Sequence, residues 1–188
     1  MIKFVSEVKG NGFTWNGLAS TTDYITAKTY LQKSVLAKTL IENIEKSLTL
    51  CINLLITTDP EVPPNYYPYM MTRGHHTSPA GNLVTWNPKG VMNVIAREKG
   101  LRPVFGKQSP ALALLHEFGH ALQHFQRREW FVKTYNRVLN QDDKALLEIE
   151  NDNINMYEEP VARELGEGIR YAYRDVGNVE YQVFSYTK

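Results

Sequence analysis

One stretch of the chain carries residues whose types and spacing are suited to binding a metal. His116-Glu117-Phe118-Gly119-His120 is an H-E-x-x-H motif inside the apolar run 111–124. On a helix, residues i and i+4 lie on one face one turn apart, so His116 and His120 can offer two imidazole nitrogens to one ion. Glu117 can reach a water activated by that ion and act as its general base. The motif predicts a zinc hydrolase centre.

The motif needs a helix that holds it in a core. Ser109 and Pro110 mark a helix start, with the proline near the first helical position. Apolar residues then recur at helical spacing on both sides of the motif, and they are Ala111, Leu112, Leu115, Ala121 and Leu122. We therefore predict a buried helix from Pro110 to about Arg127.

Two histidines do not complete a catalytic zinc site, which uses three protein ligands and leaves a fourth position for water. The third histidine of a metzincin is excluded, because Gln126 occupies its position. His124 follows His120 by four residues, but three histidines over two turns of one helix span about 12 Å, too far for one ion. We expect His124 beside the site or on the surface.

A carboxylate from a later helix is the remaining choice for the third ligand. The segment 151–173 has an apolar stripe on which Glu158 falls, four residues after Ile154 and three before Val161. A carboxylate on such a stripe is costly unless it is paired or bound to a metal. We rank Glu158 first, followed in order by Glu159, Glu164 and Glu150.

The other elements mix helices and strands. We predict strands at 2–8, 13–15, 49–57, 82–86 and 178–186, and helices at 25–48, 110–127, 129–150 and 151–173, with a break or new helix start at Asp142-Asp143. Residues 91–99 are expected to form a short helix or an irregular connection, and 59–79 a long loop. The expected fold is α+β and zincin-like, with a small sheet packed on the motif helix and a second ligand-bearing helix. Residues 1–188 are expected to form one domain.

Composition excludes several classes of function. The chain has 188 residues, a net charge of +1 and 43% hydrophobic residues, as in an ordinary globular protein without a nucleic-acid partner. Its single cysteine, Cys51, rules out a disulfide framework. No apolar run approaches membrane-spanning length, and the first residues lack the apolar core of a signal peptide. We expect a monomer made in a cytoplasm.

Three blocks of sequence resemble one family when taken in order. They are Gly81–Pro88 (GNLVTWNP), Ser109–Ala121 (SPALALLHEFGHA) and Tyr157–Tyr173 (YEEPVARELGEGIRYAY). Their order is similar to that of the NleD-like effector metallopeptidases, small zinc proteases injected by type III systems, with similar toxin domains on type VI and polymorphic-toxin proteins. The resemblance covers roughly residues 82–173. It implies a zinc endopeptidase with a carboxylate ligand at Glu158 or Glu159, secreted or injected without a cleavable signal. It also implies a protein substrate and a possible secretion-apparatus or immunity-protein partner.

The developing oxyanion of peptide hydrolysis needs a donor opposite the metal. We expect Tyr173 to be that donor, because a tyrosine hydroxyl donates without adding charge. Other candidates are Arg170, Tyr171 and the loop pair His75 and His76. Two other functions remain open: a zinc amidase acting on cell-wall peptide, and a binding domain in which His116 and His120 are core residues held by hydrogen bonds.

Overall fold

Two apolar strands form the centre of the main sheet. The computed structural model describes residues 1–10, 13–18, 20–68, 82–96, 102, 104–174 and 176–181. Strands β4 (Ile52–Ile56) and β6 (Asn82–Trp86) run parallel, and all but the first residue of β6 are buried. Burial of nearly every side chain is typical of parallel strands covered on both faces. Strand β1 (Ile2–Phe4) pairs in parallel with β4, and β5 (Asn65–Tyr67) pairs antiparallel with β6, giving the order β1-β4-β6-β5.

The predicted helix 25–48 is two helices in the structure. Helix α1 (Thr22–Leu31) ends before Ser34, and α2 (Val35–Lys46) begins after it. The buried Ser34 side chain accepts a hydrogen bond from the backbone N–H of Ala37, which is the usual way a serine starts a helix. The apolar spacing continues across this break, so periodicity alone did not reveal it.

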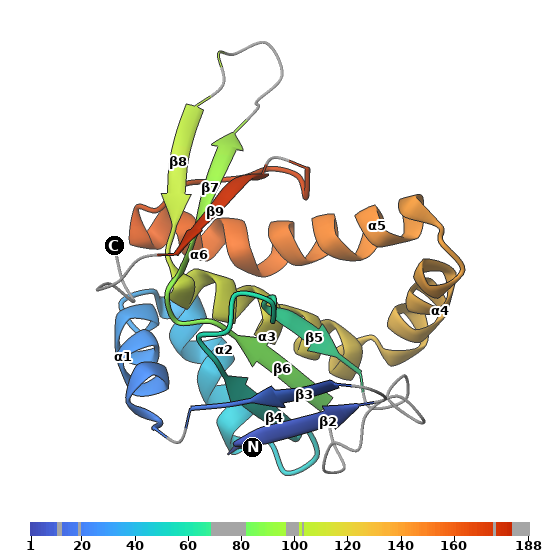
Figure 1. Ribbon diagram of the computed structural model, residues 1–188. Coiled ribbons are helices and arrows are strands. Elements are labelled where there is room, and N and C mark those ends of the chain that lie inside the picture. Colours follow the sequence, from blue (N-terminus) through green and yellow to red (C-terminus); the bar gives the residue numbers. More distant parts are fainter. Residues whose placement is uncertain are drawn as a thin grey trace.

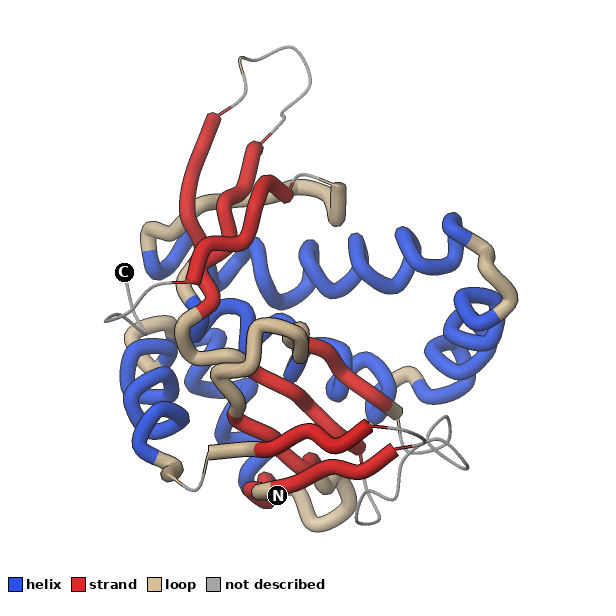
Figure 2. The backbone as a smooth tube through the Cα atoms, viewed as in Figure 1, coloured by secondary structure: helices blue, strands red, loops and turns tan. Residues whose placement is uncertain are grey.

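The predicted strand 2–8 is also divided. Its first half is β1, while β2 (Glu7–Gly10) turns away to pair antiparallel with β3 (Phe13–Asn16). Residues 91–99 were predicted to be a short helix or irregular, and this was wrong for the described part. They contribute to β7 (Gly90–Ala96), which pairs antiparallel with β8 (Val104–Gln108) and β9 (Val176–Tyr181). This three-stranded sheet, β8-β7-β9, projects beyond the helices (Figure 2).

The C-terminal half is mostly helical. Helix α3 (Pro110–Gln126) carries the H-E-x-x-H motif and is followed by α4 (Arg128–Leu139) and α5 (Asp143–Asn153). The predicted break at Asp142 is confirmed, because its carboxylate accepts from the N–H groups of Lys144 and Ala145. Helix α5 continues through a π-helical turn, η2 (Ile154–Glu158), into α6 (Glu159–Leu165). The predicted helix 151–173 stops at Gly166, whose φ of 64° is left-handed.

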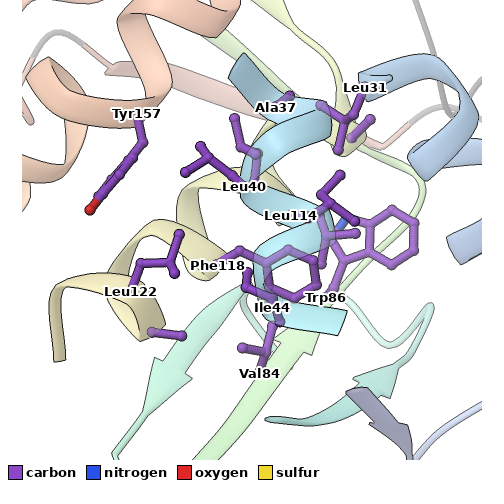
Figure 3. Close-up of a cluster of buried hydrophobic side chains, with 14 of the residues drawn as sticks. Leu31, Ala37, Leu40, Ile44, Val84, Trp86, Leu114, Phe118, Leu122 and Tyr157 are labelled. Carbon is purple, nitrogen blue, oxygen red and sulfur yellow. The ribbon is translucent and has the colours of Figure 1, made fainter. Parts of the chain in front are cut away.

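Helix α3 lies in the middle of the molecule, between the main sheet and α5 (Figure 1). Its side chains Leu114, Phe118 and Leu122 are buried together with Trp86 of β6 in one core (Figure 3). The indole N–H of Trp86 donates to the carbonyl of Pro110 at 2.7 Å, which fixes the start of α3 over the end of β6. The predicted α+β class is confirmed. No helix in the described ranges is both long and apolar enough to cross a membrane.

Candidate metal centre

The two motif histidines converge as the helical spacing predicts. The Nε2 atoms of His116 and His120 lie 3.1 Å apart, with the two rings nearly perpendicular. Both side chains are almost fully buried. Two imidazole nitrogens that lie this close together and are shielded from bulk water can provide two ligands of a metal-binding group.

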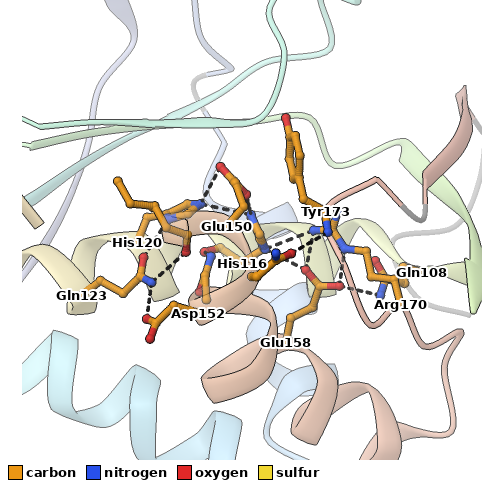
Figure 4. Close-up of polar contacts among 12 residues, drawn as sticks. Gln108, His116, His120, Gln123, Glu150, Asp152, Glu158, Arg170 and Tyr173 are labelled. Atoms are coloured by element: carbon orange, nitrogen blue, oxygen red, sulfur yellow. Dashed lines mark hydrogen bonds and ion pairs between the residues drawn. The ribbon is translucent and has the colours of Figure 1, made fainter. Parts of the chain in front are cut away.

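Glu150 of α5 supplies the third member of this group. Its carboxylate oxygens lie 3.2 Å from Nε2 of His116 and 3.4 Å from Nε2 of His120. Donor atoms bonded at about 2.1 Å to a tetrahedral zinc ion are about 3.4 Å from one another. The separations therefore fit the ligand sphere of zinc, and within the described part of the chain His116, His120 and Glu150 form the group able to hold a metal ion (Figure 4).

Glu158, ranked first as the third ligand, lies on the other side of His116. Its Oε2 is 2.7 Å from Nδ1 of His116, the nitrogen facing away from His120 and Glu150. Arg170 binds both carboxylate oxygens at 2.6 and 2.5 Å, and the amide of Gln108 donates to Oε1 at 2.8 Å. Because a carboxylate only accepts, Nδ1 of His116 donates to Glu158, and Nε2, which faces Glu150, is the nitrogen that would present its lone pair to a bound metal.

The apolar stripe predicted the burial of Glu158 but not its partner. Glu158 is 1% exposed, as a residue on the core face should be. The compensation for burying its charge comes from Arg170, which was expected from the sequence as a candidate oxyanion donor and not as the partner of Glu158. Glu150 was ranked fourth, because it precedes the segment on which the stripe was drawn.

A close approach of two helices sets the positions of Glu150 and Glu158. A Cβ added at Gly119 would lie 1.9 Å from Oδ1 of Asn153, so only glycine allows this contact. The Asn153 amide donates to the backbone carbonyl of His116 at 2.8 Å. The π-helical turn begins at the next residue, and such turns are frequent at functional sites. The α5–η2 rod is thereby held against α3 with one carboxylate on each side of His116.

The second histidine is oriented by an amide rather than a carboxylate. Nδ1 of His120 lies 2.8 Å from Oε1 of Gln123. The Gln123 amide nitrogen donates to the carbonyl of Ile149 and to Asp152, at 3.0 and 2.6 Å, so its oxygen must face the imidazole. His120 therefore also presents the lone pair of Nε2. The supporting role of Gln123 was not predicted from the sequence.

Glu117 faces the same space as the metal group. It lines a cavity of about 680 Å³ together with His116, His120, Glu150, Arg170 and Tyr173. Burial raises the pKa of the Glu117 carboxyl, and the neighbouring histidines only partly oppose this effect. A carboxylate with a raised pKa beside a metal group is suited to accept a proton from water and release it again.

The structure distinguishes among the candidate oxyanion donors. Tyr173 lines the cavity, and its ring lies 6.0 Å from the Arg170 guanidinium carbon. Arg170 is committed to Glu158, and the Tyr171 hydroxyl accepts from Arg163, which also pairs with Glu159 near the surface. His75 and His76 lie outside the described residues. Of these candidates, Tyr173 remains the one that lines the cavity without a carboxylate partner among the described residues.

The remaining candidate side chains have other partners. Glu164 accepts from the backbone N–H of Val35. Glu167 is buried and accepts from Tyr30 and from both the N–H and the hydroxyl of Ser109. His124 is buried beside the site, with its Nδ1 2.7 Å from the Tyr66 hydroxyl. None of these three acids or imidazoles belongs to the group of His116, His120 and Glu150.

Comparison with known proteins adds no relative: no family model, no curated protein and no solved structure matches the chain.

Proposed function

We propose that this protein is a zinc-dependent hydrolase of peptide bonds. One observation carries the proposal: Nε2 of His116, Nε2 of His120 and the carboxylate of Glu150 lie 3.1 to 3.4 Å apart, next to Glu117 in an open cavity. Three ligands of this kind that leave a position free are characteristic of catalytic zinc. A structural zinc site would instead be closed by a fourth protein ligand.

Each residue has a role in this proposal. His116, His120 and Glu150 would hold the zinc ion, which would supply the Lewis acidity for activating water and the scissile carbonyl. Glu117 takes the proton from the attacking water and delivers it to the leaving amine. Tyr173 donates to the oxyanion. Glu158 and Gln123 hold the imidazoles in the required tautomers.

The size of the cavity and the order of the sequence blocks bear on the substrate class. A cavity of about 680 Å³ is the size of a typical ligand site and accommodates a short peptide segment. The order of the three sequence blocks supports a secreted effector or toxin that cleaves a protein in a target cell. A zinc amidase acting on cell-wall peptide would use the same centre. A domain that only binds partners is disfavoured, because it has no need for Glu117 buried beside two imidazoles whose Nε2 atoms converge on Glu150.

The test compares the wild type with Glu117→Gln. Both proteins are purified, analysed for metal, and expressed in the cytoplasm and periplasm of bacteria and in eukaryotic cells. We expect one zinc per chain in both proteins, and cleaved cellular proteins only with the wild type. Release of peptides from purified peptidoglycan by the wild type alone would instead identify a cell-wall amidase. Equal cleavage by both proteins would refute Glu117 as the base, and absence of zinc from the wild type would refute the centre.

A further inference from the structure

A second, smaller cavity adjoins the metal group. It has a volume of about 40 Å³ and lies between β5, α4 and α5. Asn65, His120 and Glu150 line both this side cavity and the large catalytic cavity. Two of those shared residues are metal-binding candidates, so the side cavity begins where the scissile bond of a substrate would lie.

The rest of the side cavity is mostly apolar. Its walls come from Phe131, Tyr135 and Val138 on α4 and from Leu146 and Ile149 on α5. Phe131 and Ile149 belong to the buried core, and Phe131 is stacked on Tyr135 with ring centroids 5.6 Å apart. These walls are therefore held by core packing.

Three of the polar residues that line the side cavity, Tyr66, His120 and Glu150, already have partners. The Tyr66 hydroxyl lies 2.7 Å from Nδ1 of His124. His120 and Glu150 face each other and His116. A charged or strongly polar side chain entering here would lose hydration without a replacement bond, whereas an aliphatic one would gain contacts.

The volume limits the size of that side chain. A cavity needs about 10 to 15 Å³ to admit one water-sized group, so about three such groups fit. This corresponds to a short branched aliphatic side chain and leaves no room for an aromatic ring.

We propose that the side cavity between α4 and α5 receives the small aliphatic side chain of a substrate residue adjoining the scissile bond. The inference rests on the proposed zinc peptidase function and adds a specificity determinant to it. Val138 and Leu146 set the size of the accepted side chain, because both line the cavity and neither belongs to the metal group.

Hydroxamates test this without knowledge of the natural substrate, since they bind zinc directly and carry a tail of chosen size. The zinc-loaded protein is titrated with acetohydroxamate, which has a single methyl tail, and with 3-methylbutanohydroxamate, which has a branched one. We expect the branched compound to bind at least about tenfold more tightly, since full burial of its three additional carbons corresponds to about 50-fold.

Two variants change the cavity in opposite directions. Leu146→Phe fills it and should remove the tenfold preference, while Val138→Ala enlarges it and should raise the relative affinity for the longer 4-methylpentanohydroxamate. Leu139→Phe is the matched control. Leu139 is exposed at the end of α4, next to Val138, and does not line the cavity. Acetohydroxamate affinity should be similar in all four proteins, which reports an intact centre.

Different results would refute the zinc centre and the substrate subsite. If acetohydroxamate does not bind the wild type, the zinc centre is refuted and the inference falls with it. If it binds but the branched compound binds no more tightly, or if the preference is the same in Leu146→Phe and Val138→Ala as in the wild type, the side cavity is not a substrate subsite and the proposed function stands.

Discussion

Gly119 and Asn153 touch so closely that no side chain fits between them. A Cβ on Gly119 would lie 1.9 Å from Oδ1 of Asn153 and 2.9 Å from the Tyr157 ring. The contact is made inside the H-E-x-x-H motif itself, between the two histidines. Gly119 occupies a position that the H-E-x-x-H motif leaves unspecified. In this protein the position must be glycine, because the helix that carries Glu150 and Asn153 packs against it.

Replacing this glycine by alanine should push α5 away from α3. Overpacking a tight core contact costs about 1 to 3 kcal/mol. We expect Gly119→Ala to lower the free energy of unfolding by about that amount and to weaken zinc binding. Urea denaturation and a competitive zinc titration measure the two effects. In the double variant with Asn153→Ala, the loss of stability should be smaller than the sum of the single losses. Strictly additive losses would show that the two residues are not in contact.

The ligand set can be tested by removing one carboxylate at a time. Glu150→Gln should leave the dialysed protein without stoichiometric zinc, because it replaces an anionic ligand by a neutral amide. Glu158→Gln should retain zinc with an affinity lowered about 10- to 100-fold, as for residues that orient a ligand. Zinc analysis and chelator competition measure both, and Glu148→Gln on the exposed side of α5 is the control.

The Glu158 variant leaves Arg170 buried without its carboxylate, so the double variant Glu158→Gln with Arg170→Gln should accompany it. Retention of zinc in Glu150→Gln together with its loss in both Glu158 variants would reverse our assignment of the two residues.

Zinc binding should release protons. Burial lowers the pKa of His116, but hydrogen bonds with Glu150 and Glu158 outweigh this and raise it to about 10 in the metal-free protein. At a pH near 7.5 that imidazole is protonated, and zinc must displace the proton from Nε2, so about one proton should leave per ion bound. Calorimetric titrations in buffers of different ionisation enthalpy measure the number. A binding enthalpy that is the same in all buffers would contradict the prediction.

The same shift fixes the pH dependence of the metal-free protein. A histidine whose pKa is raised from 6.5 to about 10 contributes stability that is fully present below pH 6.5. That contribution is lost as the pH rises through 10. We therefore expect the free energy of unfolding of the metal-free protein to decrease over this interval, and the zinc-loaded protein to lack this decrease. Denaturation at several pH values, with and without zinc, gives the comparison.

Tyr173→Phe tests the oxyanion donor. Loss of one such donor lowers kcat by about 100- to 1000-fold in other hydrolases. We expect a decrease of this order with zinc content and KM nearly unchanged, because the ring and its contact with Arg170 remain. Tyr171→Phe is the control, since the Tyr171 hydroxyl contacts Arg163 instead of the cavity. An unchanged kcat in Tyr173→Phe would assign the oxyanion to another group.

Sequence periodicity predicted the parts of the fold that depend on a single element. The placement of His116, Glu117 and His120 on one buried helix is local, and so is the helix start at Asp142. The split of 25–48 at Ser34 and the strand character of β7 were missed. The split follows from a local serine cap that the continuous apolar spacing concealed, whereas β7 depends on its partners β8 and β9, which come later in the chain.

The third metal ligand also could not be predicted from the periodicity of one helix. A stripe drawn at 3.6 residues per turn identified Glu158 as buried, but a π-helical turn changes the phase of the helix at that position. The stripe also carries no information on which nitrogen of His116 a carboxylate meets. Arg170 was the available signal, because an arginine that can pair with Glu158 removes the need for a metal there.

The pairing of Glu158 with Arg170 has a consequence for the choice of ion. Since the arginine cancels this carboxylate, Glu117 and Glu150 are the two negative charges that face the histidine nitrogens. A divalent cation brings that sum to zero, whereas a monovalent or trivalent one would leave a net charge in a poorly hydrated space, which is costly. We therefore expect the centre to prefer a divalent cation on charge alone. Once neutral, it can admit an uncharged amide without recruiting a counter-ion.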